Sequence, residues 1–240
     1  MQYSLTEEQR MLQEMVRRLA KEQVEPGAAK RDADAEFDWE MVELMRQNGL
    51  YGIDFSEAYG GSNAGMLALA IVVEELSKVD AACGLLVADH ELGCLPILLA
   101  ANEEQKQRFL PKLATGEHLS AFALTEPAAG SDVARLRCRA VKDGDSYILN
   151  GRKNFITNGT IADHFVVLCM TDPETEKRHA RFSVIFVDAD RPGLTKQKIH
   201  NKLGIRASDT AELIFEDVRV PAENLIGQRG RGFYQFMHFF

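Results

Sequence analysis

Residues 120–132 read SAFALTEPAAGSD, and the pattern of the whole chain changes at the first of them. Before Ser120, apolar residues recur at the spacing of helices. From Ser120 to Pro221 they alternate or cluster in short runs divided by turns, as in an antiparallel barrel or sandwich. The sequence therefore predicts an α+β protein with an all-helical domain over 1–117, an antiparallel β-barrel-like domain over 118–229, and the start of a further helix over 230–240.

The helical half begins with a recognisable start signal. Thr6 and Gln9 have the spacing of a capping box, in which each side chain accepts a hydrogen bond from a free backbone N–H of the other residue. The apolar face that follows comprises Met11, Leu12, Met15, Val16 and Leu19. Further helices are predicted over 38–47, 66–76, 81–88, 92–100 and 102–109. Pro96 is expected to kink its helix or to mark its first turn, and Pro111 is expected to follow the last of them.

The second half contains short runs typical of strands. They are predicted over 120–125, 137–142, 146–150, 165–170, 183–187 and 212–220. Asp143-Gly144 between two of them indicates a hairpin. A last helix is predicted to begin near Gly232, and the apolar residues from Phe233 to Phe240 have nothing downstream to cover them. Such a surface usually has a partner, so we expect either a truncated chain or a second chain.

Composition excludes several classes of protein. The 240 residues carry a net charge of −8 and no block of basic residues, which disfavours binding to nucleic acid or to an anionic membrane. The four cysteines form no CxxC pair and have no histidines spaced for a zinc site, so we expect buried reduced thiols and no metal. The first residues do not resemble a secretory signal or a transit peptide, and no apolar run reaches the ~18 residues of a membrane span. The sequence predicts a cytoplasmic protein.

The common nucleotide-binding and hydrolase signatures are absent: there is no GxxxxGK[ST], no correctly placed GxGxxG and no GxSxG. The segment 121–132 offers different chemistry. Backbone groups beside Thr125 are suited to the edge of a planar ring, and Gly130 and Ser131 to a phosphate. From the residues alone, a plain strand and turn capped by Ser131 and Asp132 is the simpler interpretation.

Two later segments have the same double interpretation. The segment 151–159, GRKNFITNG, is predicted to be a strand that ends in an Asn-Gly turn. Phe155 is suited to lie against a planar ring and the Thr157 hydroxyl to donate to a ring nitrogen, but in isolation a hairpin strand with Phe155 in the core is the simpler interpretation. In the segment from Lys202 to Thr210, Arg206 either binds an anionic group with its polar neighbours or pairs with Asp209 in a solvated loop.

Taken together and in order, these segments resemble the acyl-CoA dehydrogenase family. The quoted matches are TEPAAGSD at 125–132, KNFITNG at 153–159, KLGIRASDT at 202–210 and FEDVRVP at 215–221. TEEQRML at 6–12, GIDFSEAYGG at 52–61 and EEQKQRFLPKLATGE at 103–117 are also similar to the family. The resemblance extends from about residue 3 to the end of the chain.

The resemblance implies an FAD site in which Phe122 to Ser131 line the flavin pyrimidine edge and the pyrophosphate. The cofactor-binding residues that it implies are Phe122, Leu124, Thr125, Gly130, Ser131, Phe155, Ile156 and Thr157. Ser131 would also contact the thioester substrate, and the Thr157 hydroxyl would face flavin N5. Many family members have Trp at the position of Phe155, and Phe keeps the planar apolar contact while losing the indole N–H.

The reaction implied is α,β-desaturation of an acyl-CoA with hydride transfer to flavin N5, followed by electron transfer to an electron-transferring flavoprotein. Family members also contain a C-terminal helical bundle that carries the catalytic carboxylate, and full-length members are tetramers. We therefore expect the base beyond residue 240. Glu126 is better interpreted as a turn-forming residue, and Glu91 as either a residue at the acyl end of the pocket or a buried, paired carboxylate.

Three functional interpretations remain open at this stage. The first is a piece of an acyl-CoA dehydrogenase, an oxidoreductase of fatty acid metabolism that is inactive or nearly inactive alone and binds FAD weakly or not at all. The second is a non-catalytic flavin- or acyl-CoA-binding subunit that needs a partner chain. The third is a relative of the same fold with different chemistry, such as an acyl-CoA oxidase or, less in keeping with the intact segment around Ser131, a flavin monooxygenase.

Overall fold

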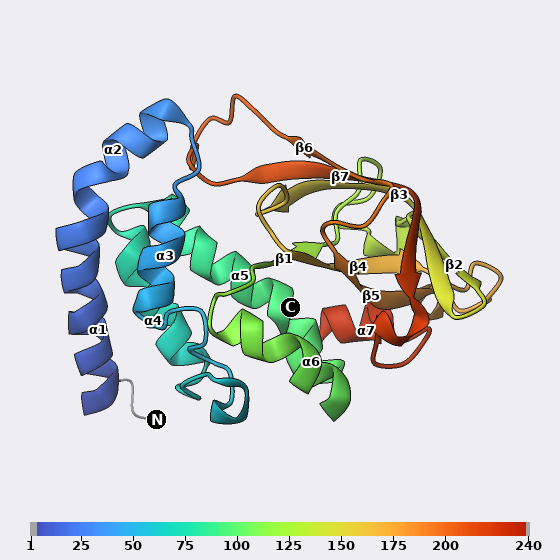
Figure 1. Cartoon of the computed structure of the whole chain (residues 1–240), viewed down its shortest axis with the longest axis horizontal. Coiled ribbons are helices and arrows are strands. Elements are labelled where there is room, and N and C mark those ends of the chain that lie inside the picture. Colours follow the sequence, from blue (N-terminus) through green and yellow to red (C-terminus); the bar gives the residue numbers. More distant parts are fainter. Residues whose placement is uncertain (1–3, 239–240) are drawn as a thin grey trace. The chain divides into compact units, whose positions relative to one another are not determined.

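A computed structural model describes residues 4–238, which form two compact units (Figure 1). The helical unit contains the described residues up to Ala88 together with Pro111–Glu117 and Asn201–Ser208. The sheet unit contains Asp89–Leu110, His118–His200 and the described residues from Asp209 onward. The units thus do not follow chain order, because the middle of the chain contributes helical residues to the sheet unit.

The helical unit is built on α1 (Glu7–Leu19), which continues through one π-helical turn, Ala20–Val24, into α2 (Glu25–Asp34). The predicted capping box is present: Gln9 N donates to Thr6 Oγ1 over 3.2 Å, and Thr6 N donates to Gln9 Oε1 over 3.0 Å. One residue of the predicted apolar face was placed wrongly, since Met11 is 65% exposed. It lies about 80° around the helix from the buried Leu19, at the edge of the face.

Two further helices complete this unit, α3 (Trp39–Gln47) and α4 (Met66–Ser77), and α4 packs against α1. The side chain of Asp38 caps α3 by accepting from Glu40 N over 2.9 Å. Between α1 and α4, the Arg17 guanidinium donates two hydrogen bonds, of 3.0 and 2.9 Å, to the carboxylate of the buried Glu75. The bond from Arg17 is the main reason that the pKa of Glu75 is lowered to about 2.

Replacing Glu75 with glutamine is expected to lower the free energy of unfolding at pH 7 by about 1–2 kcal/mol, because Arg17 is half-exposed and solvent weakens the pair. The folded carboxyl has a lower pKa than the unfolded one, so its contribution is present above pH 4.5 and is lost as the pH falls toward 2. Urea denaturation at pH 7 and pH 3 should show the variant and the parent converging at the lower pH. The control is Glu74→Gln, which removes an exposed neighbour, and an equal loss in that variant would contradict the prediction.

Helix α5 (Ala81–Ala100) corrects the sequence prediction, which divided it into two. It is continuous through Pro96, and α6 (Glu103–Ala114) likewise includes Pro111. Residues on both sides of each proline are buried, and this burial offsets the missing backbone hydrogen bond. By length and composition alone α5 is apolar enough to cross a membrane, although Asp89 and Glu91 interrupt its apolar run. Because 56% of its most apolar window is buried in the fold, it resembles a core helix.

The sheet unit contains one eight-stranded sheet with the order β6-β7-β3-β2-β4-β5-β8, and β1 pairs with β4 off this path. The strands are β1 (Ser120–Ala123), β2 (Arg139–Asp143), β3 (Ser146–Thr157), β4 (His164–Met170), β5 (Phe182–Asp188), β6 (Leu194–Lys198), β7 (Thr210–Pro221) and β8 (Leu225–Ile226). The predicted α+β class is confirmed, and the β2–β3 hairpin turns at Asp143-Gly144 as predicted.

Three features of this sheet differ from the sequence prediction. Strand β1 runs parallel to β4, from Ser120 opposite His164 to Ala123 opposite Val167, so the sheet is mixed. The predicted strands at 146–150 and in 151–159 are one continuous strand, β3, which pairs with β7 as far as Thr157 opposite Thr210. Strands β6 and β8 were missed because the first is polar on both faces and the second has only two residues.

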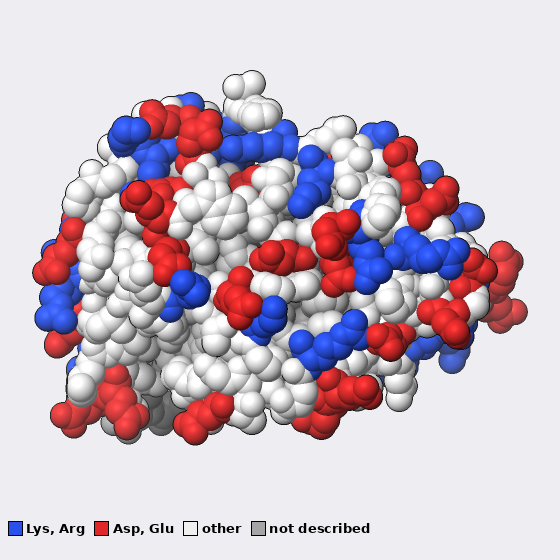
Figure 2. Space-filling model, viewed as in Figure 1, with Lys and Arg blue, Asp and Glu red and all other residues white. Residues whose placement is uncertain are grey.

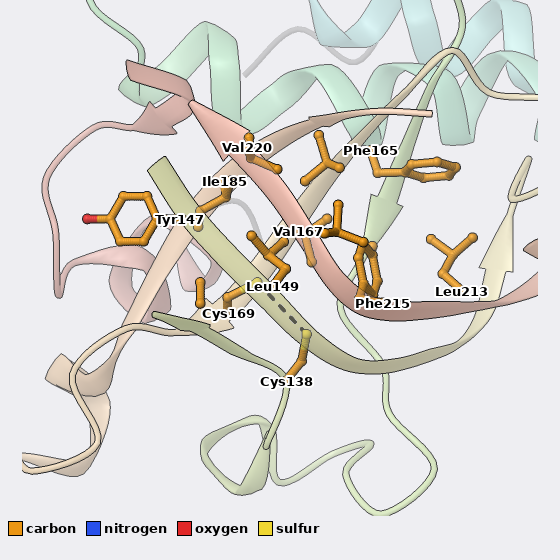
Figure 3. Close-up of a cluster of buried hydrophobic side chains, with 14 of the residues drawn as sticks. Cys138, Tyr147, Leu149, Phe165, Val167, Cys169, Ile185, Leu213, Phe215 and Val220 are labelled. Carbon is orange, nitrogen blue, oxygen red and sulfur yellow. Dashed lines mark hydrogen bonds between the residues drawn. The ribbon is translucent and has the colours of Figure 1, made fainter. Parts of the chain in front are cut away.

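The core of the sheet unit lies between β3, β4, β5 and β7, whose side chains point toward one another in Figure 3. Its members include Tyr147, Leu149, Phe165, Val167, Cys169, Ile185, Leu213 and Phe215. The four cysteines are buried and none forms a disulfide, as predicted. Cys138 and Cys169 lie side by side, with their sulfur atoms 4.0 Å apart.

The last described helix, α7 (Gly232–Met237), packs against β4 and β5. The prediction of an uncovered apolar face is wrong for Phe236, which is fully buried and stacks on Phe122 with ring centroids 4.3 Å apart. Phe239 and Phe240, the other end of that predicted face, lie outside the described residues. Figure 2 shows acidic and basic side chains interspersed over the face in view, in keeping with the scattered basic residues of the sequence.

Candidate functional site

The turn after β1 is organised around the carboxylate of Glu126. This carboxylate accepts hydrogen bonds from Arg137 N over 2.7 Å, from Cys138 N over 2.9 Å and from Lys153 Nζ over 2.9 Å. The backbone of Glu126 also exchanges two hydrogen bonds with Ala129, of 3.0 and 3.1 Å, which close the turn. Glu126 is thus a turn-forming residue, as the sequence predicts, and both of its carboxylate oxygens accept hydrogen bonds from other residues of the chain.

Lys153 is the partner that sequence reasoning missed. Its side chain is fully buried on β3, and Nζ donates both to Glu126 and to the Leu124 carbonyl, each over 2.9 Å. A buried ammonium is tolerated only where such partners satisfy it. The alternation of β3 was a usable signal, since Tyr147 and Leu149 point inward and Lys153 lies on the same face. This pair ties the end of β1 to the middle of β3.

The next two residues of β3 form a bulge. Lys153 pairs with Leu213 and Ile156 with Ala211, so Asn154 and Phe155 together face a single residue of β7. Asn154 N donates to the Thr125 carbonyl over 2.8 Å, which fixes this bulge against the turn after β1.

Phe155 is strained and exposed at this bulge. It has φ = +58°, a left-handed conformation that costs a bulky residue about 1–3 kcal/mol, and its ring is 65% exposed. Asn154 stabilises this geometry by accepting from Phe155 N at its side-chain oxygen over 3.0 Å. The interpretation of Phe155 as a core residue is therefore wrong. The protein holds an aromatic ring outward at an energetic cost, as binding sites for planar ligands do.

Thr157 ends β3, and its hydroxyl interacts with the carboxyl of Asp89 on α5. Burial raises the pKa of Asp89 to about 7, and the Thr157 hydroxyl opposes that rise. Asp89 Oδ2 is buried without a hydrogen-bond partner among residues 4–238. Sequence reasoning did not single out Asp89, although a polar residue inside an apolar helix was a signal. Its neighbour Glu91, which it did single out, is buried in the same helix.

The remaining predicted residues of the turn are accessible. Gly130 and Ser131 are exposed, and a Cβ added at Gly130 would meet no protein atom within 4 Å. Asp132 is anchored beside them by two hydrogen bonds from Arg178 Nη2, of 2.8 and 2.9 Å. The turn therefore has open space beside Gly130, and Arg178 holds its far end in place at Asp132. The ring of Phe122, in contrast, is half-buried and stacks on Phe236.

The segment from Lys202 to Thr210 divides between the two units. In the helical unit, Arg206 N donates to Asp32 Oδ1 over 3.1 Å, and the Arg206 guanidinium donates to the Ala33 carbonyl over 3.4 Å. In the sheet unit, the Asp209 carboxylate accepts from the backbone N–H and the hydroxyl of Thr160, each over 2.7 Å. Both residues thus have structural hydrogen bonds in their own units.

Comparison with known proteins identifies the family. The family model described as the acyl-CoA dehydrogenase N-terminal domain matches residues 6–117, and that of the acyl-CoA dehydrogenase middle domain matches residues 121–218. The chain belongs to the acyl-CoA dehydrogenase family. The residues around Lys153, Phe155 and Thr157 lie within the second match.

Individual members of the family agree with this assignment. The short-chain-specific acyl-CoA dehydrogenase of Clostridium acetobutylicum is 44% identical over 234 residues, which are 97% of this chain and 61% of that protein. A chain from the structure described as the electron-transferring flavoprotein of Acidaminococcus fermentans is 42% identical with a TM-score of 0.95, covering 99% of this chain and 62% of that chain. A glutaryl-CoA dehydrogenase of Mycobacterium smegmatis in complex with FADH2 is 30% identical with a TM-score of 0.87, covering 98% of this chain and 59% of that chain.

The matches cover this acyl-CoA dehydrogenase family chain almost fully but their own proteins only in part. The chain spans about 60% of the length of the curated relatives that it matches.

Proposed function

We propose that this chain supplies the flavin-facing and thioester-facing residues of an FAD-dependent acyl-CoA dehydrogenase, which desaturates an acyl-CoA between the α and β carbons. The observation that carries the proposal is Phe155, a strained and exposed aromatic residue held outward by Asn154 and fixed to the turn at Thr125. Membership of the acyl-CoA dehydrogenase family and the FADH2 complex of one relative support it.

The side chains and backbone around Phe155 fit a flavin. The Phe155 ring offers a planar apolar surface, and Thr157 two residues along offers a hydroxyl donor for a ring nitrogen. The open space at Gly130 lets a phosphate approach the backbone, where the exposed Ser131 hydroxyl can donate to a phosphate or a thioester oxygen. When bound, FAD supplies the hydride acceptor for the oxidation.

The chain's own residues would orient the reactants in this reaction. Ile156 is 2% exposed and anchors the strand beneath Phe155, while the Lys153–Glu126 pair keeps the turn at Leu124 and Thr125 in place. Hydrogen bonds to the thioester carbonyl would stabilise the charge that develops when the α-proton is removed. Because Glu126 is fully engaged, we do not assign it the role of the base.

The partners follow from the same assignment. The substrate is an acyl-CoA thioester, and an electron-transferring flavoprotein takes the electrons onward. We further propose that the active form is a homo-oligomer in the cytoplasm. The mixed surface charge and the absence of a basic block in the sequence are in keeping with a soluble enzyme of small-molecule metabolism.

Titration of the full 240-residue chain with FAD, followed by amide chemical shifts, tests the cofactor assignment and detects weak binding as well as tight binding. We expect shifts concentrated at 122–131 and 155–157. No shifts at saturating FAD, or shifts confined to other residues, would contradict the proposal.

The variant Phe155→Gly separates stability from binding at this site. Glycine adopts φ = +58° without strain, so the free energy of unfolding is expected to stay within about 1 kcal/mol of the parent or to rise. Loss of the ring contact is expected to weaken FAD binding about tenfold. Met11→Ala, which removes a side chain that is also 65% exposed, should leave FAD affinity unchanged. Unchanged FAD affinity in Phe155→Gly would refute the stacking role.

A further inference from the structure

Asp89 has a buried carboxylate oxygen that no described residue satisfies by a hydrogen bond. Its Oδ2 atom is buried and accepts no hydrogen bond from any residue between 4 and 238, whereas the Glu126 carboxylate accepts three. A purely structural carboxylate in the interior would be paired as Glu126 is, because a buried unsatisfied oxygen is costly. Packing alone therefore does not explain why the chain has an aspartate with a buried, unsatisfied oxygen at this position.

Burial is the main influence on the pKa of this carboxyl, and among residues 4–238 the Thr157 side chain is the one that opposes it. Other charged and titratable groups lie on the same two elements. On α5, the adjacent His90 accepts from Ser120 N at Nδ1 over 3.2 Å, and Glu91 is buried next to it; on β3, Lys153 is held by Glu126. The protonation of Asp89 is thus coupled mainly to the hydroxyl of Thr157.

A threonine hydroxyl has a single proton to donate, and this restricts the pair to two arrangements. An ionised Asp89 only accepts, so the Thr157 hydroxyl must point its proton inward to the carboxylate. A neutral Asp89 can donate its own proton to Thr157 Oγ1, which leaves the hydroxyl proton free for a second acceptor. The two arrangements differ by one proton on Asp89.

We propose that Asp89 is a positioning residue whose protonation decides whether the Thr157 hydroxyl donates inward to Asp89 or outward to a ligand seated against Phe155. The neutral form of Asp89 is the binding-competent one. The identity of the ligand, a flavin whose isoalloxazine nitrogen accepts the hydrogen bond from Thr157, rests on the proposed function. The coupling between the carboxyl and the hydroxyl does not depend on that identity. Burial places the pKa of Asp89 at about 7, so the change falls in the physiological range of pH.

The coupling is measured without any ligand by following the side-chain carbonyl carbon of Asp89 by NMR as the pH is varied. We expect a midpoint near 7 in the parent and a higher midpoint in Thr157→Val, because the hydroxyl stabilises the ionised form. Asp54, whose pKa is raised by burial alone, serves as the internal control and should titrate identically in both proteins. A parent midpoint below about 5, or no change in Thr157→Val, would overturn the coupling.

The consequence for binding is measured by titrating FAD into the full chain at pH 6 and pH 8. We expect the parent to bind about tenfold more weakly at pH 8, which is the loss of one hydrogen bond. Asp89→Asn, whose amide donates as the neutral acid does, should bind equally at both values of pH. Asp143→Asn removes the same charge at an exposed hairpin and should keep the parent's dependence.

The outcomes separate the two proposals. If FAD binds and the dependence on pH is the same in Asp89→Asn as in the parent, the role of Asp89 is wrong and the cofactor assignment stands. If FAD binds to none of the proteins, the cofactor assignment and the outward half of the Asp89 proposal both fail. The NMR titration then decides the coupling to Thr157 on its own.

Discussion

Replacing Lys153 with methionine is expected to lower the free energy of unfolding by about 3–5 kcal/mol. Methionine fills a similar volume, so the loss does not come from a cavity. It comes from the Glu126 carboxylate, which keeps its two backbone donors but loses the only cation that neutralises its charge in the interior among the described residues. Urea denaturation followed by circular dichroism measures the effect at neutral pH.

Two further variants show whether the charge is the cause. Lys142→Met makes the same replacement at an exposed position of the neighbouring strand β2 and should change the free energy of unfolding by less than about 0.5 kcal/mol. Adding Glu126→Gln to Lys153→Met removes the uncompensated charge, so the double variant should lose much less than the sum of the two single losses. Strictly additive losses would mean that the pair does not act as a unit.

The features predicted correctly from the sequence are those that local patterns specify. The capping box at Thr6 and Gln9 and the hairpin at Asp143-Gly144 depend on a few adjacent residues, and the change of period at Ser120 marks where strands begin. The features predicted wrongly depend on partners distant in the chain. Helix α5 continues through Pro96 because its flanks are buried, and no local pattern records what buries them.

In the candidate site, too, local sequence patterns were predicted correctly and contacts with distant residues were missed. Phe155 and Thr157 were predicted because they lie in a segment that resembles the family. The exposure and positive φ of Phe155, however, follow from the bulge in β3 opposite β7. Lys153 and Asp89 were missed because each is defined by a contact with a residue at least 27 positions away. A sequence shows which side chains carry chemistry, whereas burial and pairing decide which of them are available for it.

Replacing Asp89 with asparagine is expected to make the chain more stable at pH 8 by up to about 4 kcal/mol and to leave it nearly unchanged near pH 4. Folding raises the pKa of this carboxyl from 3.8 to about 7, so between these values the folded chain holds a proton that the unfolded chain has lost. Stability therefore falls as the pH rises through this window, by about 1.4 kcal/mol per unit, and becomes level above pH 7. Asparagine carries no such proton and should not show this fall.

The measurement is the difference in free energy of unfolding between the parent and Asp89→Asn at each pH from 4 to 8, so that the titration of all other groups cancels. The curve for Asp143→Asn, an exposed control, should run parallel to that of the parent. A constant difference across the range would mean that Asp89 is already ionised in the folded chain and cannot direct Thr157 by its proton. A difference that grows up to pH 7 and then levels would mean that the chain keeps a costly neutral carboxyl beside the hydroxyl, at a position where asparagine would be more stable. Such a cost is expected where a side chain is retained for its titration and not for its packing.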